Sequence, residues 1–133
     1  MIFIDTGALL ARYFSRDQHH EAATRVWEKI KLKKESCFTS NFILDETFTL
    51  LARRAGYVFA AERAHRIYAS RYMTILRPTD EDELKALEYF EKFAEHRVSF
   101  TDCVSFALMR RHKIRRVFTF DFHFRLAGFI CHP

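Results

Sequence analysis

The sequence predicts an α/β fold in which helices cover both faces of a mostly parallel sheet of four or five strands. Short apolar runs alternate with longer segments in which apolar residues recur at helical spacing, as expected for strands joined by crossover helices. The 133 residues include only 3 Gly and 2 Pro, too few for the many tight turns of an all-β chain. We therefore expect one domain over residues 1–133.

Each expected strand is a short apolar run with a polar residue or a chain breaker near its end. Acids follow the first and fourth strands, at Asp5 and Asp121, and Pro78 stops the third. The strands are expected at residues 2–4, 37–39, 73–76, 117–120 and 129–131, the last of them at an edge of the sheet. The full order is β-α-α-β-α-α-β-α-α-β-β, with no internal repeat or linker.

Each expected helix begins near a residue that can cap its N-terminus. Asp5 or Thr6 suits the first helix, and Asp17 suits the second. Ser99 and Asp102 have the spacing of a capping box at the start of the last helix. The helices are expected to start near residues 6, 17, 40, 58, 79 and 99 and to run to about residues 14, 33, 54, 72, 93 and 112.

Composition excludes several classes of protein. Hydrophobic residues make up 49% and aromatic residues 16% of the chain, which argues against intrinsic disorder. No apolar run approaches the ~20 residues of a membrane span, and the N-terminus lacks the basic region of a secretory signal. The cysteines, Cys37, Cys103 and Cys131, are odd in number and widely spaced. We expect a reduced, cytoplasmic protein with no membrane association.

Charge is distributed unevenly along the chain. Residues 80–95 hold seven acids against two lysines, whereas residues 97–133 hold seven Lys or Arg against two acids. The formal net charge is +5, so an acidic helix belongs to an otherwise basic molecule. A basic surface favours a polyanionic partner such as nucleic acid, although many mildly basic domains bind no such partner.

Four carboxylates are expected to meet at one edge of the sheet. Ligands of open parallel sheets bind at the carboxyl ends of the strands, which is where Asp5 and Asp121 are expected. Asp102 lies in the first turn of a helix whose N-terminus faces the same edge, and Glu46 lies two turns into the helix after the second strand. Each acid taken alone has another interpretation: Asp102 as a capping residue, Glu46 as a solvated helix residue with Asp45 as its rival.

Clustered carboxylates require protons or cations. Two of them about 4 Å apart repel by roughly 1–4 kcal/mol. Ligands that are all oxygen suit Mg²⁺ or Mn²⁺ better than Zn²⁺. Such ions can activate water and support in-line displacement at phosphorus. The acids therefore point to metal-dependent phosphodiester chemistry.

Four short segments, in order and over essentially the whole length, match a known family. They are residues 2–6, residues 39–46 with Leu50 and Leu51, residues 99–102 with Ala107, and residues 118–121 with Phe124. On these segments the chain resembles the PIN-domain nucleases, especially the VapC-type toxins of prokaryotic toxin–antitoxin pairs. The resemblance implies a PIN-like three-layer α/β fold with a central sheet flanked by helices.

The resemblance also implies an activity, a cofactor and partners. The acidic residues of the family fall on Asp5, Glu46, Asp102 and Asp121, and this choice favours Glu46 over Asp45. The implied function is a divalent-metal-dependent endoribonuclease that hydrolyses RNA with Mg²⁺ or Mn²⁺, forms a homodimer and is neutralised by an antitoxin. Some relatives carry a further acid shortly after the last one, whereas here Asp121 is followed by Phe122, His123 and Phe124.

Further residues are candidates for supporting roles. Hydroxyl and amide side chains near the acids are expected to orient them, namely Thr6, Asn41 and Thr119. Basic residues are candidates for RNA contact, with helix-end or ordinary loop charges as the simpler interpretation: Arg53, Arg54, Arg110, Arg111, Lys113, Arg115, Arg116 and Arg125.

Two rival functions remain at the level of the sequence. Asp5-Thr6-Gly7 matches the aspartic-protease tripeptide, but no second copy is present and the chain is expected to be largely helical. The stronger rival is a non-catalytic RNA-binding or regulatory PIN-like module. Incubation with RNA and Mn²⁺, with and without a chelator, separates this module from an enzyme.

Overall fold

The fold is a five-stranded sheet in which every pair of neighbouring strands is parallel. The computed structural model describes residues 1–133 and gives the strand order β3-β2-β1-β4-β5. The strands are β1 (Ile2–Ile4), β2 (Cys37–Ser40), β3 (Met73–Leu76), β4 (Arg116–Phe118) and β5 (Ile130–His132). The expected α/β class with a central parallel sheet is confirmed.

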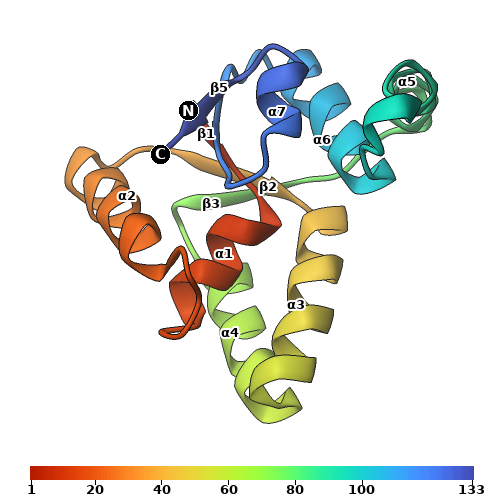
Figure 1. Ribbon diagram of the computed structural model, residues 1–133. Coiled ribbons are helices and arrows are strands. Elements are labelled where there is room, and N and C mark those ends of the chain that lie inside the picture. Colours follow the sequence, from red (N-terminus) through yellow and green to blue (C-terminus); the bar gives the residue numbers. More distant parts are fainter.

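Helices lie on both sides of this sheet. Figure 1 shows α1, α3 and α4 below the strands and α5, α6 and α7 above them, with α3 and α4 projecting together as a hairpin. The helices are α1 (Thr6–Tyr13), α2 (His20–Lys33), α3 (Asn41–Ala55), α4 (Tyr57–Ala69), α5 (Asp80–Lys92), α6 (Phe100–Arg111) and α7 (His123–Leu126), with a 3₁₀ turn at Ala94–His96. None of the helices combines the length and the apolar character needed to cross a membrane.

Large aromatic residues of the strands and of α6 and α7 belong to the buried core. Phe3 of β1, Phe118 of β4, Phe106 of α6 and Phe124 of α7 are fully buried. The Phe106 and Phe124 rings meet edge to face at 5.1 Å between centroids, a favoured aromatic geometry. Because residues 102–109 are all buried, α6 is a central helix, and the residues at its start, Ser99 and Asp102, line the same cleft as Asp5.

The boundary of β4 differs from the expectation. The strand ends at Phe118 instead of residue 120, so Asp121 does not follow it directly. The Thr119 N–H still donates to the His132 carbonyl, but the Thr119 hydroxyl bonds to the side chain of Asp5 and the backbone of Asp121. These side-chain bonds turn the chain out of the strand and place Asp121 in a loop before α7.

Other boundaries move by up to a turn. Helix α2 begins at His20 instead of residue 17, because the Asp17 carboxylate accepts the His19 N–H in a turn before the helix. Helix α4 ends at Ala69 instead of residue 72. The four-residue helix α7 was not expected, since it is too short to show a helical period.

Candidate active site

The structure brings the four predicted acids to one cleft at the carboxyl edge of the sheet. A cavity of about 420 Å³ is lined by Asp5, Glu46, Asp102 and Asp121. Asp5 and Asp121 come after β1 and β4, which are neighbours in the sheet, whereas Glu46 lies on α3 and Asp102 on α6. The expected convergence of these side chains is therefore found, while their catalytic role remains a prediction.

Asp5 lies at the junction of β1 and α1 and is almost completely buried, with 6% exposure. Its Oδ2 accepts a hydrogen bond of 2.7 Å from the Thr119 hydroxyl. Burial raises the pKa of Asp5 to about 6, opposed by the bond from Thr119 and reinforced by the charges of Asp121 and Glu46. The Asp5 carboxylate is therefore rigidly held and is costly to ionise without a nearby cation.

Asp102 occupies the first turn of α6, where the sequence allowed a capping role. The Ser99 hydroxyl accepts the Asp102 N–H at 3.1 Å, but the Asp102 carboxylate does not return a bond to the backbone of Ser99. Burial, followed by the charges of Asp5 and Asp121, raises the pKa of Asp102 to about 9. Half of the expected capping box is thus present, and the carboxylate is left free to face the cleft.

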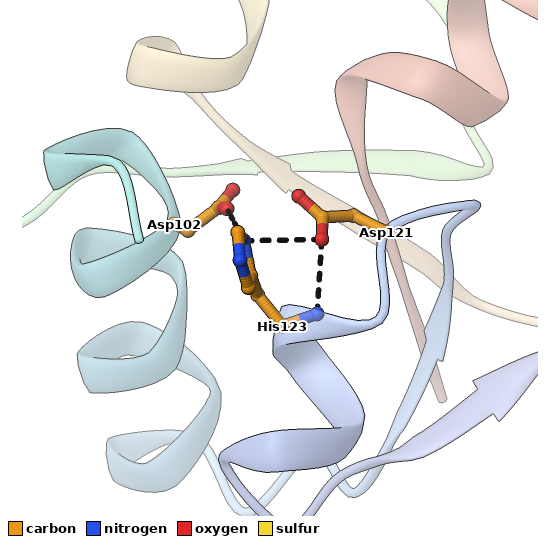
Figure 2. Close-up of side chains that lie close together, drawn as sticks. All are labelled: Asp102, Asp121 and His123. Atoms are coloured by element: carbon orange, nitrogen blue, oxygen red, sulfur yellow. Dashed lines mark hydrogen bonds and ion pairs between the residues drawn. The ribbon is translucent and has the colours of Figure 1, made fainter. Parts of the chain in front are cut away.

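Asp121 is held by hydrogen bonds to residues on both sides of it in the sequence. Its N–H donates to the Thr119 hydroxyl at 3.0 Å, and its Oδ1 accepts the His123 N–H at 2.9 Å. Figure 2 shows Asp102, Asp121 and His123 pointing toward one another. The Nδ1 atom of His123 lies 3.1 Å from Asp121 Oδ1 and 3.7 Å from Asp102 Oδ2.

Glu46 and its sequence neighbour Asp45 point to different places. Glu46 is half-buried and lines the cleft with the three aspartates. Asp45 is exposed and lines only an adjoining groove of about 670 Å³, which Glu46 also borders. The geometry therefore agrees with the choice of Glu46 that the family resemblance implied.

The three supporting residues have different surroundings. Thr119 contacts both Asp5 and Asp121 and so links two of the acids. Thr6 lines the cleft, and its hydroxyl is buried without a hydrogen-bond partner. Asn41 lines the adjoining groove instead of the acidic cleft, and its Oδ1 is also buried and unpartnered. Only Thr119 directly positions an acid.

Several predicted RNA-contacting arginines are engaged within the protein. Arg110 donates to the Ala127 carbonyl at 2.7 Å, and Arg111 binds both carboxylate oxygens of Asp82. Arg116 pairs with Glu35, which also lies 3.6 Å from the N-terminal amine of Met1. Arg115 precedes Arg116 at this amino edge of the sheet, opposite the cleft. None of these four residues lines the acidic cleft, and RNA contact by Arg110, Arg111, Arg115 and Arg116 stays a prediction.

The other arginines near the site have different surroundings. Arg53 lines the adjoining groove, Arg54 lies over the Phe14 ring, and Arg125 is exposed on α7. Arg97, which sequence reasoning missed, is an exposed cation on the wall of the acidic cleft. Its signal was faint, because a single arginine before a helix cap resembles any loop charge.

The donor set of the cleft fits a divalent cation. Four carboxylates offer oxygen ligands, and the pKa values of Asp5 and Asp102 show that their charged forms lack compensation from the protein. His123 Nδ1 is buried near two of these carboxylates and has no hydrogen-bond partner. A hard cation bound by these groups would offset their repulsion and occupy the unused donor sites.

Comparison with known proteins agrees with this fold and cleft. The chain matches the PIN domain over residues 2–130. It is 38% identical over 130 residues to the 23S rRNA-specific endonuclease VapC20 of Mycobacterium tuberculosis, covering 98% of this chain and 96% of that protein. It is 32% identical to a VapC ribonuclease of Archaeoglobus fulgidus, covering 92% of this chain and 78% of that one.

Solved structures give the same picture. The crystal structure of M. tuberculosis VapC20, described as a sarcin–ricin loop cleaving toxin, superposes with a TM-score of 0.90 at 36% identity over the full length of both chains. FitAcB from Neisseria gonorrhoeae superposes with a TM-score of 0.75, covering 100% of this chain and 97% of that chain. At 16% identity, this second match supports the fold alone.

Proposed function

The chain belongs to the PIN-domain family, and we propose that Asp5, Glu46, Asp102 and Asp121 are its catalytic and metal-binding residues, with Mg²⁺ or Mn²⁺ as the cofactor. It is a metal-dependent endoribonuclease of the toxin–antitoxin type. The observation that carries the assignment is the convergence of four carboxylates whose charges are uncompensated, with the pKa of Asp102 near 9. We treat residues 1–133 as one such nuclease domain.

The four acids would hold the cation while the surrounding chain holds the acids. The Thr119 hydroxyl fixes Asp5, the Ser99 cap fixes the backbone of Asp102, and the His123 N–H fixes Asp121. When bound, a divalent cation lowers the pKa of a water ligand and offsets negative charge on phosphate oxygens.

Arg97 is the cation placed to meet the RNA phosphate. It lies on the wall of the cleft, is exposed, and has no ion-pair partner within the protein. A guanidinium at that position can pair with a phosphate oxygen. In this arrangement Arg97 would orient the scissile phosphate, and the carboxylates would hold the cation beside it.

We propose ribosomal RNA as the substrate, and specifically a sarcin–ricin type stem-loop. This rests on the VapC20 relative, which is named for 23S rRNA and matches along nearly the whole chain. A synthetic stem-loop of that sequence, incubated with the protein and Mn²⁺, should be cut once and at one position. A scrambled loop of the same length should remain intact.

The test of the catalytic assignment uses the same RNA. Cleavage should require Mn²⁺ or Mg²⁺, stop with a chelator, and fall by at least about a hundredfold in Asp5→Asn. Cleavage that survives the chelator and Asp5→Asn contradicts the proposal. Binding of RNA without any cutting by the wild-type protein would instead support a non-catalytic RNA-binding PIN-like module.

An antitoxin partner, a homodimer and a cytoplasmic location complete the proposal. The toxin–antitoxin assignment supports an antitoxin partner. The net charge of +5 suits an RNA substrate, and a ribosomal RNA substrate would be found in the cytoplasm. Light scattering of the purified protein tests the dimer. Co-purification with the product of the neighbouring reading frame tests the antitoxin.

A further inference from the structure

The His123 side chain lines the acidic cleft, and only its backbone N–H has been given a role above. We propose that His123 binds the metal ion directly through Nδ1, so that the site combines one nitrogen with carboxylate oxygens and prefers Mn²⁺ to Mg²⁺. This inference rests on the proposed metal-dependent function and specifies the chemistry of that site. Three observations support it: the spacing of the ligand atoms, the unpartnered nitrogen and the fixed ring.

The spacing of the atoms suits a common ion. One ligand atom each from Asp102, Asp121 and His123 can be chosen so that all lie within 4.8 Å of one another. His123 Nδ1 is 3.1 Å from Asp121 Oδ1 and 3.7 Å from Asp102 Oδ2. Two ligands that each lie about 2.1–2.2 Å from an ion are at most about 4.4 Å apart. Both measured distances fall inside that limit.

The only polar groups near this nitrogen are the carboxylates of Asp121 and Asp102. His123 Nδ1 is buried and makes no hydrogen bond, although buried polar atoms are nearly always bonded. The nearest acceptor, Asp121 Oδ1, already accepts the backbone N–H of His123. Leaving such a nitrogen unsatisfied costs free energy, and coordination to a cation would remove that cost.

The ring is held in place by its surroundings. His123 begins α7, its side chain is 15% exposed, and its ring lies 4.5 Å from the Phe122 ring. Figure 2 shows the imidazole reaching between the two aspartates, from α7 toward α6. A side chain fixed in this way binds without the entropy loss of ordering a mobile one.

The donor type sets the preference among metals. Mg²⁺ is bound almost entirely by oxygen. Mn²⁺ also favours oxygen ligands, but as the first member of the transition-metal series it accepts an imidazole nitrogen more readily than Mg²⁺ does. A site that includes His123 should therefore discriminate between Mn²⁺ and Mg²⁺ more strongly than a site with only carboxylates. Substitution of His123 by aspartate replaces the nitrogen donor with an oxygen donor and should reduce this discrimination.

The experiment is pulsed EPR spectroscopy of Mn²⁺ bound to the RNA-free protein. The wild type and the control His65→Ala, a change at an exposed residue of α4, should show nitrogen hyperfine coupling from a coordinated imidazole. His123→Asp should still bind Mn²⁺ but lose that coupling. In His123→Ala the Kd for Mn²⁺ should rise by at least about tenfold, as loss of even an outer partner of a metal site does.

The outcomes separate the two levels of the proposal. Bound Mn²⁺ without nitrogen coupling, or coupling that persists in His123→Asp, overturns the role of His123 and leaves the carboxylate site standing. In that case the imidazole serves as an ion-pair partner of Asp102 and Asp121. Failure of the wild type to bind Mn²⁺ at all overturns the metal site and this inference together. Thermal unfolding of each variant confirms that it is folded.

Discussion

Two buried aspartates, Asp82 and Asp102, begin with the same local sequence pattern and end with opposite properties. Each is the third residue of a helix whose cap is a hydroxyl residue, Thr79 for α5 and Ser99 for α6. The two residues are buried to nearly the same extent, with 5% exposure for Asp82 and 8% for Asp102. The local sequence therefore does not distinguish them.

Their partners distinguish them. Burial works against ionisation of Asp82, but the Arg111 guanidinium and the bonds from Thr79 hold the pKa of Asp82 below its usual value. Asp102 has no such cation, and burial with the charges of Asp5 and Asp121 raises its pKa to about 9. The ion pair between the buried Asp82 and Arg111 joins α5 to α6. A buried acid that lies among other acids, such as Asp102, instead marks a place where a bound ligand has to supply the positive charge.

The largest expected effect is on RNA cleavage. Asp102→Asn should lower the cleavage rate by at least about a hundredfold, since it removes a charged ligand of the cation that offsets the charge of the phosphate. Asp82→Asn should cleave at nearly the wild-type rate once corrected for folded protein, because Asp82 lies outside the cleft. A gel assay with labelled RNA and Mn²⁺ measures both. Equal loss in the two variants would erase the distinction between these aspartates.

The Asp82→Asn and Asp102→Asn substitutions should change the free energy of unfolding in opposite directions. At pH 8 without metal, Asp82→Asn should lower the free energy of unfolding by about 2 kcal/mol, because it weakens charged hydrogen bonds to Arg111. Asp102→Asn should raise it by at least about 1 kcal/mol, the worth of one pKa unit. Urea unfolding followed by circular dichroism provides the measurement. A destabilised Asp102→Asn protein would contradict the raised pKa.

The pH dependence should separate the two residues further. Raised pKa values of about 6 for Asp5 and about 9 for Asp102, against the usual 3.8, give stability that is complete below about pH 4. That stability is lost as pH rises toward 9, because the unfolded chain releases its protons first. The lowered pKa of Asp82 acts in the other direction, and its contribution is lost as pH falls.

Urea midpoints of the metal-free protein between pH 3 and pH 9 test this pattern. The alkaline decline should flatten in Asp102→Asn and remain in Asp82→Asn. Saturating Mn²⁺ should also flatten it in the wild type, since a bound ligand stabilises the folded state. An alkaline decline that neither Asp102→Asn nor Mn²⁺ changes would assign it to other groups.

A smaller effect is expected at Thr119, which positions Asp5 without touching the RNA. Thr119→Val should lower the cleavage rate by about tenfold, since it removes the hydroxyl that bonds Asp5 and the Asp121 N–H. Thr119→Ser keeps the hydroxyl and should recover most of the rate. A slow Thr119→Ser together with a wild-type rate in Thr119→Val would show that the methyl group, and therefore packing, is what matters.

The sequence predicted the order of the elements because each is a local pattern. The apolar runs at β1, β2 and β3 end where turn or capping residues begin, and the helices carry clear apolar periods. The end of β4 was misplaced, since Thr119 and Phe120 favour a strand locally and leave it only because of bonds to Asp5 and Asp121. Helix α7 was missed because four residues carry no period.

The acids of the site were predictable from topology, but their environment was not. Acids near the ends of adjacent parallel strands must share an edge, which is enough to group Asp5 with Asp121. The capping spacing at Ser99 and Asp102 could not show that the carboxylate turns away from the cap, since Thr79 and Asp82 have the same spacing and form the complete box. His123 and Arg97 carry no signal beyond their residue type and become candidates only through distances.

Calorimetric titration of Mn²⁺ into the metal-free protein at pH 7.5 tests the central claim most directly. In buffers of different ionisation enthalpy, Mn²⁺ should bind the wild type and Asp82→Asn with release of protons, because Asp102 is protonated at that pH before the cation binds. Asp102→Asn should bind far more weakly and release fewer protons. Binding that is absent from the wild type, or unchanged in Asp102→Asn, would contradict the account.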